Sequence, residues 1–305
     1  MPRLRSPEGD RRADPGPRAA ARAARRAHDE NFPVAFRLAP RGVRDDLVAI
    51  YAFCRATDDI GDEGDRSRDE RLEALDDWET DLLLAFGGEP RDPRLRALAV
   101  ATSRRRLEPE PFLRLIEANR MDQRRNRWGT YEELLEYCRH SAAPVGRMVL
   151  DVIGHRDAWR REMSEATCIG LQLINFWQDV RRDLDDRDRV YLPREDMDRF
   201  GVDEEHLRLP AATRAVRGLI AFEVARAREW LAEGAALHRF VGRRYALDIR
   251  MFTAGGLALC DAIERSGYDT LSRRPAPGRL GRARIAAGAM ARLMRPAPGG
   301  LEGDG

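Results

Sequence analysis

Residues 168–186, CIGLQLINFWQDVRRDLDD, form a pattern that predicts a helix with apolar residues on nearly every side. Six apolar side chains cover most of its circumference: Ile169, Leu173, Ile174, Phe176, Trp177 and Val180. A helix of this kind is typical of a protein interior. The remaining side carries a row at helical spacing: Cys168, Leu171, Gln172, Asn175, Asp179 and Asp183. Because unpaired polar groups are costly to bury, the polar members of this row need partners such as arginines or metal ions.

The rest of the chain favours helices as well. Leu, Ala, Arg and Glu, which are strong helix formers, are abundant, and no segment alternates apolar and polar residues for long enough to indicate a strand. Pro and Gly interrupt the pattern near residues 87–93, 107–112, 190–196 and 207–213, and the pieces between them are long enough for helices. The sequence therefore predicts an all-α fold.

Composition narrows the class of protein. The chain has 305 residues, 43% of them hydrophobic, which is enough for a sizeable core. Its 54 basic and 52 acidic residues nearly cancel, which argues against a nucleic-acid partner recruited by bulk charge. The four cysteines are far apart and predict buried thiols of a reduced cytoplasmic protein, not disulfides or a zinc site: Cys54, Cys138, Cys168 and Cys260.

Both ends of the chain differ from its middle. Residues 1–27 contain almost no large apolar side chains, which predicts disorder, and they lack the apolar segment of a secretory signal. Residues 272–305 form a basic tail that is a candidate for contact with an anionic membrane surface, although a solvated Arg-rich tail accounts better for its composition. No run approaches the roughly 18 apolar residues needed to cross a bilayer. We expect one helical domain over residues 28–271, cytoplasmic or at most peripheral to the inner face of the membrane.

A second acidic stretch, YAFCRATDDIGDEGD at residues 51–65, ends another helix. One face of that helix carries residues at i, i+3, i+4, i+7 and i+11: Leu47, Ile50, Tyr51, Cys54 and Asp58. Asp62 lies one turn further along this face. Because a solvated charged end should point away from the core, these two acids are expected to have another role; Asp59, Glu63 and Asp65 fit ordinary surface acids as well.

The two Asp-x-x-x-Asp pairs, Asp58 with Asp62 and Asp179 with Asp183, together predict a site for Mg²⁺, with Mn²⁺ as the alternative ion. Mg²⁺ takes oxygen ligands and usually binds a few carboxylates together with substrate phosphate and water. Such ions would stabilise a departing diphosphate, and an apolar pocket behind them would keep a carbocation away from water. Either pair alone would fit a charged helix surface. Two such pairs, each on the apolar face of its helix, favour the metal site.

These stretches resemble the squalene/phytoene synthase family over about residues 28–271. AIYAFCRATDDIGDE resembles the first aspartate-rich motif of that family, and GLQLINFWQDVRRDLDDRDRVYLP resembles the second. The resemblance implies a single-domain isoprenoid synthase, built as a helical bundle with a central apolar pocket. It also implies an enzyme that depends on Mg²⁺ and takes a prenyl diphosphate as substrate.

The resemblance implies roles for individual residues. Four aspartates would be catalytic and would hold Mg²⁺: Asp58, Asp62, Asp179 and Asp183. Asp59 and Asn175 would be further metal ligands. The remaining site residues would bind the substrate. Arg55, Gln172 and Asn175 would contact the diphosphate. Tyr51 and Tyr191 would contact the substrate head or the cation, and Phe32 would line the channel entrance. Arg55 suits a phosphate because its guanidinium offers a fork of donors.

Two shorter stretches, ENFPVA at 30–35 and HSAAPVGR at 140–147, resemble the hydroxysqualene synthase branch of bacterial hopanoid synthesis. That branch would convert presqualene diphosphate and water to hydroxysqualene and diphosphate, and NADPH is not expected. The same motifs also serve condensation of two farnesyl diphosphates to presqualene diphosphate or squalene, or of two geranylgeranyl diphosphates to phytoene.

A non-enzymatic alternative is a helical scaffold of a membrane-lipid pathway. Such a scaffold would tolerate Asp→Asn changes in both aspartate pairs and would release no diphosphate. Other enzymes of squalene or hopanoid synthesis are candidate protein partners under either interpretation.

Overall fold

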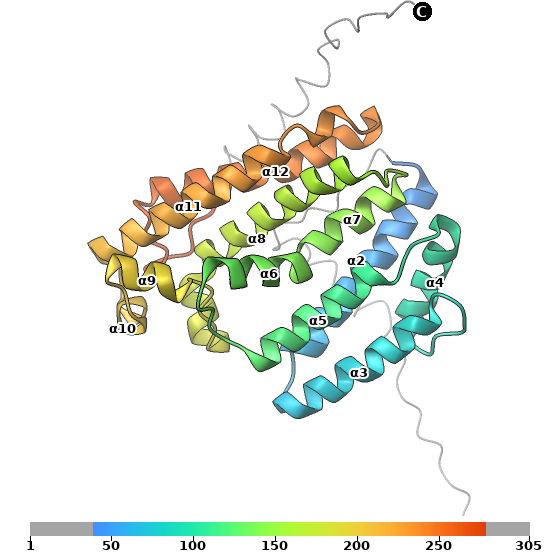
Figure 1. Ribbon diagram of the computed structural model, residues 1–305, viewed down its shortest axis with the longest axis horizontal. Helices are drawn as coiled ribbons and strands as arrows, with labels where there is room; N and C mark the ends of the chain where they lie inside the picture. The colour runs from blue at the N-terminus through green and yellow to red at the C-terminus, as the bar shows by residue number, and fades with distance from the viewer. Residues whose placement is uncertain (1–38, 279–305) are drawn as a thin grey trace, which may run out of the picture. The chain divides into compact units, whose positions relative to one another are not determined.

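The computed structural model describes residues 39–278, which fold into the helices shown in Figure 1. In chain order these are α2 (Arg41–Asp62), α3 (Arg68–Leu84), α4 (Pro93–Arg105), α5 (Glu110–Arg124), α6 (Tyr131–Ser141), α7 (Ala143–Val152), α8 (Ala158–Arg187), α9 (Arg194–Phe200), α10 (Glu204–Arg208), α11 (Arg214–Gly234), the 3₁₀ helix η1 (Leu237–Arg239) and α12 (Arg243–Arg265). Within residues 39–278 no strand is present, and the isolated parallel bridge between Arg127 and Val190 is the β-type pairing found there. The predicted all-α fold is confirmed.

Each predicted interruption separates two helices, namely α3 from α4, α4 from α5, α8 from α9 and α10 from α11. At two of these junctions a side chain satisfies a free N–H group of the next helix: Asp92 before α4 and Thr213 before α11. The Asp92 carboxylate accepts from the Arg94 N–H, and Pro93, which has no N–H, occupies the first turn of α4. Ser67 and Glu70 form a reciprocal capping box at the start of α3.

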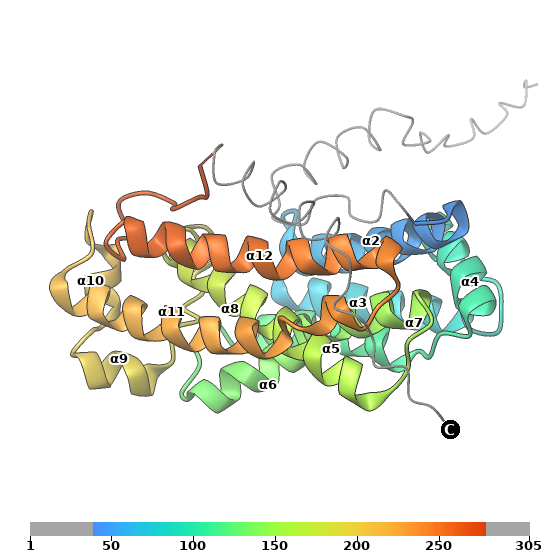
Figure 2. The same cartoon turned by 90° about the horizontal axis from the view of Figure 1, so that it is seen from above.

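α8 is the helix around which much of the core is built. It contacts α6, α7, α11 and α12, which surround it in Figures 1 and 2. Ile169, Leu173, Ile174 and Trp177 are completely buried, and burial of each such side chain contributes roughly 1.5–3 kcal/mol. α11 approaches α8 closely at Gly234, where an added Cβ would lie 2.0 Å from Thr167 Oγ1. Any side chain at this position would therefore force the helices apart.

The polar row of α8 lies where the sequence pattern placed it. Cys168, Leu171, Gln172, Asn175 and Asp179 are all half-buried, while Asp183 is buried. The residues that flank this row around the helix, such as Ile169, Leu173 and Phe176, are buried. One side of an otherwise buried helix is thus left partly accessible along its length.

The prediction for α2 needs correction. Of the expected face, Ile50 is buried, but Tyr51 and Asp58 are exposed, and Leu47 and Cys54 are only half-buried. The buried stripe is displaced around the helix, because α3, α4, α5 and α7 cover a different side: Val43, Ala49, Ile50, Phe53, Ala56, Thr57 and Gly61. The first acidic pair therefore borders the core and does not continue it.

The other expectations about the chain have mixed outcomes. The four cysteines are free thiols, as predicted, but only Cys138 and Cys260 are buried, while Cys54 and Cys168 are half-buried. None of the helices within residues 39–278 is both long and apolar enough to cross a membrane. Phe32, the predicted tail at residues 1–27 and the part of the basic tail after residue 278 lie outside the described residues.

A buried carboxyl group on α11 makes the stability of the fold depend on pH. Glu223 is 0% exposed, and burial raises its pKa to about 8, with the Asp196 carboxylate beside it adding to the shift and Arg226 opposing it. The unfolded chain releases this proton near pH 4.3. The folded state therefore binds more protons between about pH 4.5 and 8, and its stability falls as pH rises through that window.

Glu223→Gln should therefore flatten this pH dependence, because glutamine mimics the protonated carboxyl. We expect the free energy of unfolding at pH 8 to increase by about 1–3 kcal/mol, with little change near pH 4.5. Urea unfolding at several pH values measures this. Glu233→Gln, at an exposed position of the same helix, is the matched control and should leave the slope unchanged. If the unfolding free energy depended on pH equally in both variants, Glu223 would not be the source of the pH dependence.

Candidate active site

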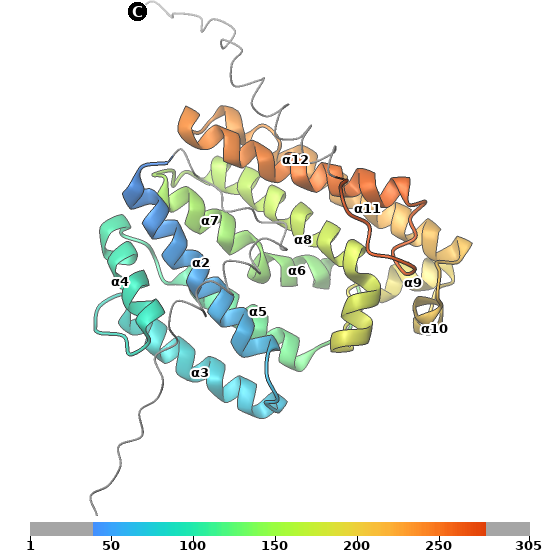
Figure 3. The same ribbon diagram turned by 180° about the vertical axis from the view of Figure 1, so that it is seen from behind.

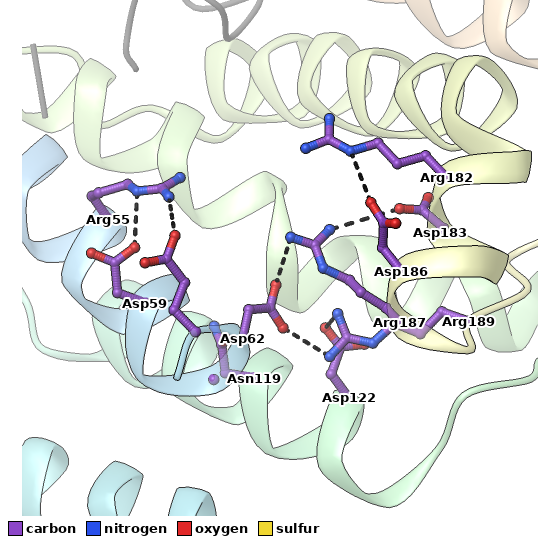
Figure 4. Close-up of polar contacts among 12 residues, drawn as sticks. Arg55, Asp59, Asp62, Asn119, Asp122, Arg182, Asp183, Asp186, Arg187 and Arg189 are labelled. Carbon is purple, nitrogen blue, oxygen red and sulfur yellow. Dashed lines mark hydrogen bonds and ion pairs between the residues drawn. The ribbon is translucent and has the colours of Figure 1, made fainter. Parts of the chain in front are cut away.

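The C-terminal ends of α2 and α8 meet at a pair of arginines (Figures 3 and 4). Arg189 Nη2 lies 2.9 Å from Asp62 Oδ1, and Arg187 Nη2 lies 3.5 Å from Asp62 Oδ2. Arg187 Nη1 also lies 3.7 Å from Asp183 Oδ1 on α8. Cationic side chains thus connect one member of each predicted aspartate pair. Asp62 and Asp183, which are more than 100 residues apart in the chain, therefore lie close together in the fold.

Arg189 also contacts a buried acid that neither pair contains. Its Nη1 lies 3.4 Å from Asp122 Oδ2 on α5, and the Tyr137 hydroxyl on α6 donates to the same oxygen at 2.8 Å. Burial raises the pKa of Asp122 to about 7, although Arg189 acts in the opposite direction. Burial also raises the pKa of Tyr137 well above its ordinary value. Asp122 therefore holds or yields a proton near neutral pH.

Stacked aromatic rings lie beneath these charges. Tyr191 is buried and stacks on Phe176 with ring centroids 3.8 Å apart and planes 10° apart. Trp128 stacks on Tyr191 from another direction at 4.7 Å, and Tyr137 lies 5.8 Å away. A small cavity of about 10 Å³ is bordered by Phe176 and Tyr191 together with Asp183 and Arg189. Charged side chains and aromatic rings thus border the same small cavity.

The first acidic motif is positioned by its glycine. Gly61 is buried, and a Cβ at this position would lie 2.1 Å from Asn119 Oδ1 on α5. The Gly61 carbonyl accepts from Gln123 Nε2 at 3.0 Å and from Arg71 Nη1. A glycine within a helix is normally unfavourable. Here it permits α2 to approach α5 closely, next to Asp62.

Arg55 and the neighbouring acids form a separate group on α2 (Figure 4). Arg55 Nε lies 3.0 Å from Asp59 Oδ1, and its Nη2 lies 3.2 Å from Glu63 Oε1. Asp58 is exposed on the same helix. Asp59, which was predicted as a further metal ligand, and Glu63 thus pair with the arginine that was predicted to bind phosphate.

Asp179 is held by a segment that follows α12. Arg274 Nε donates to Asp179 Oδ1 at 2.5 Å, and Nη2 donates to Oδ2 at 2.8 Å. The adjacent residue of α8, Gln178, donates from Nε2 to the Pro275 carbonyl at 2.5 Å. The start of the predicted basic tail, residues 272–278, therefore contacts α8 beside the second aspartate pair.

Asp183 differs from Asp179 in its environment. It is 8% exposed, and burial raises its pKa to about 7, with the like charge of Asp179 adding to the shift. Arg187 and Arg189 act in the opposite direction. Two acids of this region, Asp122 and Asp183, thus carry pKa values near 7, which is characteristic of functional sites.

The donor atoms present suit a hard divalent cation. Asp62 and Asp183 bring carboxylate oxygens to the facing ends of α2 and α8, and Mg²⁺ prefers oxygen ligands. Asp122 Oδ1 is buried and accepts no hydrogen bond from the described residues, so this oxygen retains coordination capacity. Within residues 39–278, however, no three acidic, His or Cys side chains lie close enough to hold an ion as they stand. Arg187, Arg189 and Arg274 occupy the carboxylates instead.

Comparison with known proteins identifies the family. The family model for squalene/phytoene synthase matches residues 25–281. The chain belongs to the squalene/phytoene synthase family. The resemblance seen in the two aspartate-rich motifs is thereby confirmed.

Individual relatives fall into two groups within this family. A hydroxysqualene synthase of Rhodopseudomonas palustris is 40% identical over 196 residues, which cover 63% of this chain and 65% of that protein, somewhat less than two thirds of its length. A phytoene synthase of Arthrospira platensis is 36% identical over 266 residues, covering 80% of this chain and 83% of that protein. The crystal structure of squalene synthase HpnC from Alicyclobacillus acidocaldarius superposes with a TM-score of 0.75 and 44% identity, covering 82% of this chain and 93% of that one.

The structure brings together most, but not all, of the predicted site residues. Asp62, Asp179, Asp183 and Tyr191 lie around the arginines and the aromatic rings. Gln172 and Asn175 are half-buried on the same side of α8, where Gln172 lies two turns and Asn175 one turn before Asp179. Tyr51, Arg55, Asp58 and Asp59 lie on α2, where Arg55 pairs with Asp59.

Sequence reasoning missed five residues of this site: Asp122, Tyr137, Arg187, Arg189 and Arg274. A signal for two of them was present. Arg187 and Arg189 stand in the same charged segment as Asp183, and buried acids require cations. The pattern of its own helix does not show which way the Asp122 side chain points. Tyr137 and Arg274 carried no local signal.

Proposed function

We propose that this protein is a Mg²⁺-dependent isoprenoid synthase that acts on a prenyl diphosphate, with presqualene diphosphate as the substrate and hydroxysqualene as the product. The observation that carries the proposal is the connection of Asp62 and Asp183, one acid from each aspartate pair, through Arg187 and Arg189 beside stacked aromatic rings. Carboxylates and arginines together suit a diphosphate, and the rings suit a carbocation.

Within this site the aspartates of both pairs would hold the metal ions, with Asp59 and Asn175 as further candidates. Bound Mg²⁺ would supply Lewis-acid stabilisation of the departing diphosphate. Arg187, Arg189 and Arg274 would then exchange carboxylate partners for phosphate oxygens, which guanidinium groups bind equally well. Arg55 and Gln172 are proposed to contact the diphosphate as well, Tyr51 the substrate head or the cation, and Phe32 is proposed to line the channel entrance.

The proposed reaction balances without a reductant. The C–O bond to diphosphate breaks, and its electron pair leaves with the diphosphate. The resulting cyclopropylcarbinyl cation rearranges, the oxygen of a water molecule forms a bond to carbon, and that water releases one proton. Tyr137, Tyr191, Phe176 and Trp128 are buried and stack on one another beside the charged groups, and aromatic rings so placed would stabilise the cation. Asp122, with a pKa of about 7, is a candidate acceptor for the proton.

Phytoene formation from two geranylgeranyl diphosphates is the second candidate function. The similarity to a phytoene synthase over 80% of this chain supports it. Hydroxysqualene formation is preferred because a hydroxysqualene synthase shows 40% identity and the HpnC structure 44%. All of these reactions begin with ionisation of a diphosphate, so the site described above serves each of them.

A product assay distinguishes the candidates. Purified protein and Mg²⁺ are supplied separately with presqualene, farnesyl and geranylgeranyl diphosphate, with and without NADPH, and the extracted lipids are identified by mass spectrometry. We expect hydroxysqualene from presqualene diphosphate, with equal yield in the two NADPH conditions. Phytoene from the C20 substrate would favour the second candidate, and absence of diphosphate release from all three would favour the scaffold.

A further inference from the structure

The turn that follows α8 is held by residues outside the two aspartate pairs. Asn126, Arg127, Asp188 and Glu204 form a connected group, named here the Arg127 clamp. Asp188 caps α8 in the left-handed backbone conformation, with φ at 51°. A residue with a Cβ adopts this conformation rarely and keeps it where surrounding contacts hold it.

Arg127 provides those contacts. Its Nη1 donates to the Asp188 carbonyl oxygen, and its Nη2 donates to Asp188 Oδ1 at 2.8 Å. Asn126 Nδ2 donates to the other carboxylate oxygen at 3.0 Å, and the Val190 N–H donates to the Asn126 carbonyl at 3.0 Å. Both the backbone and the side chain of Asp188 are therefore attached to the segment before α6.

Glu204, the first residue of α10, fixes Arg127 from its other side. It accepts from Arg127 Nε at 2.6 Å and from Nη2 at 2.9 Å. Arg127 Nη1 also donates to the Asn126 carbonyl at 3.0 Å. Every nitrogen of the guanidinium is thus engaged, which gives Arg127 a single orientation.

The residues on either side of Asp188 are the two arginines that join the aspartate pairs. Arg187 contacts Asp62 and Asp183, and Arg189 contacts Asp62 and Asp122. The directions of their side chains depend on the backbone at Asp188, because a change in its φ and ψ would rotate one arginine relative to the other. The Arg127 clamp therefore determines the directions of the Arg187 and Arg189 side chains.

We propose that the Arg127 clamp positions Arg187 and Arg189 so that both guanidinium groups bind one diphosphate. This inference rests on the proposed function, which makes diphosphate the ligand. Simultaneous binding by two guanidinium forks requires both to be held in place before the ligand arrives, and displacement by about 1 Å can cost about 100-fold. Arg127 is thus a positioning residue that acts on the ligand through its neighbours.

Arg127→Met tests the role, since it keeps the apolar stem and removes every hydrogen bond. The probe is inorganic pyrophosphate with Mg²⁺, titrated into the full chain by calorimetry. We expect the dissociation constant to rise about tenfold or more. Asp188→Gly, which retains the backbone conformation and loses the carboxylate, should show a smaller rise, and Arg127→Lys should fall between wild type and Arg127→Met.

Arg228→Met is the matched control. Arg228 is 33% exposed, against 31% for Arg127, and pairs with Asp261 and Glu264 to join α11 to α12. Its loss should lower the unfolding temperature about as much and leave pyrophosphate binding unchanged. If Arg127→Met is folded and binds pyrophosphate within twofold of wild type, the positioning role is wrong.

A double-mutant cycle separates positioning from general destabilisation. If Arg127 acts through the two arginines, Arg127→Met should have almost no further effect in a protein that already carries Arg187→Met and Arg189→Met. Equal effects in both backgrounds would overturn the proposal. Pyrophosphate binding requires no turnover, so a wild type that binds it but converts no prenyl diphosphate would overturn the proposed function alone. A wild type that does not bind it would overturn both.

Discussion

Asp179→Asn is expected to lower the rate of diphosphate release from the prenyl substrate by about 10³-fold or more, while the helical content and unfolding temperature stay close to those of wild type. Asparagine has nearly the same shape but lacks the charge that would hold a metal ion and stabilise charge on the leaving group. Asp179 is 15% exposed and its carboxylate faces Arg274, so the core does not depend on it. Steady-state release of pyrophosphate and circular dichroism measure the two properties.

The neighbouring Asp186 offers a matched control for this change. It lies on the same helix seven residues later, is 66% exposed and pairs with Arg182 at 3.7 Å on the helix surface. Asp186→Asn should change the rate by less than about twofold, as is usual for an exposed pair. Retention of more than a tenth of wild-type activity by Asp179→Asn would remove Asp179 from the metal site and favour the charged-helix interpretation of the motif.

Arg189→Met is expected to reduce both activity and stability. Arg189 is 9% exposed and is the cation nearest to the buried carboxylate of Asp122 as well as to Asp62. Removing one member of a buried ion pair leaves an uncompensated charge and costs about 3–5 kcal/mol. For a domain of this size that corresponds to a fall in unfolding temperature of roughly 6–15 °C. Loss of a diphosphate contact should lower kcat/KM about 100-fold as well.

A second substitution shows whether the uncompensated charge of Asp122 causes the loss of stability in Arg189→Met. Arg189→Met combined with Asp122→Asn removes the carboxylate that Arg189 neutralised, so the double variant should regain about 1–2 kcal/mol of stability while activity stays low. Urea unfolding at pH 8 measures the recovery. Arg182→Met, at a 58% exposed position of α8, should be neutral. A double variant less stable than Arg189→Met would show that Asp122 and Arg189 contribute independently.

Several parts of the site followed from local sequence. The α8 pattern predicted a buried helix with one polar side, because the 3.6-residue period of a helix determines which residues share a face. The half-buried row from Cys168 to Asp179 confirms that prediction. Pro and Gly predicted the breaks between helices, since their backbone preferences act locally. The spacing of the aspartates likewise depends on one helix at a time.

Other parts could not be predicted in this way. The face of α2 was placed wrongly because four helices compete to cover it, and its period alone does not show which side they contact. Gly61 appeared unfavourable within a helix until Asn119 was found against it. Asp122 and Tyr137 belong to the site because α5 and α6 bring them to Arg189, from positions 50 or more residues earlier in the chain.

The amino-acid sequence by itself determined the all-α fold, the two aspartate pairs and the family, because each depends on residue type and on spacing within a single helix. The tertiary structure alone decided which cations neutralise those aspartates, which aromatic rings lie beneath them and which turn holds Arg187 and Arg189. Those features depend on contacts between distant segments. Such contacts form when burial of apolar surface packs the helices together, and no local pattern records which segments will meet.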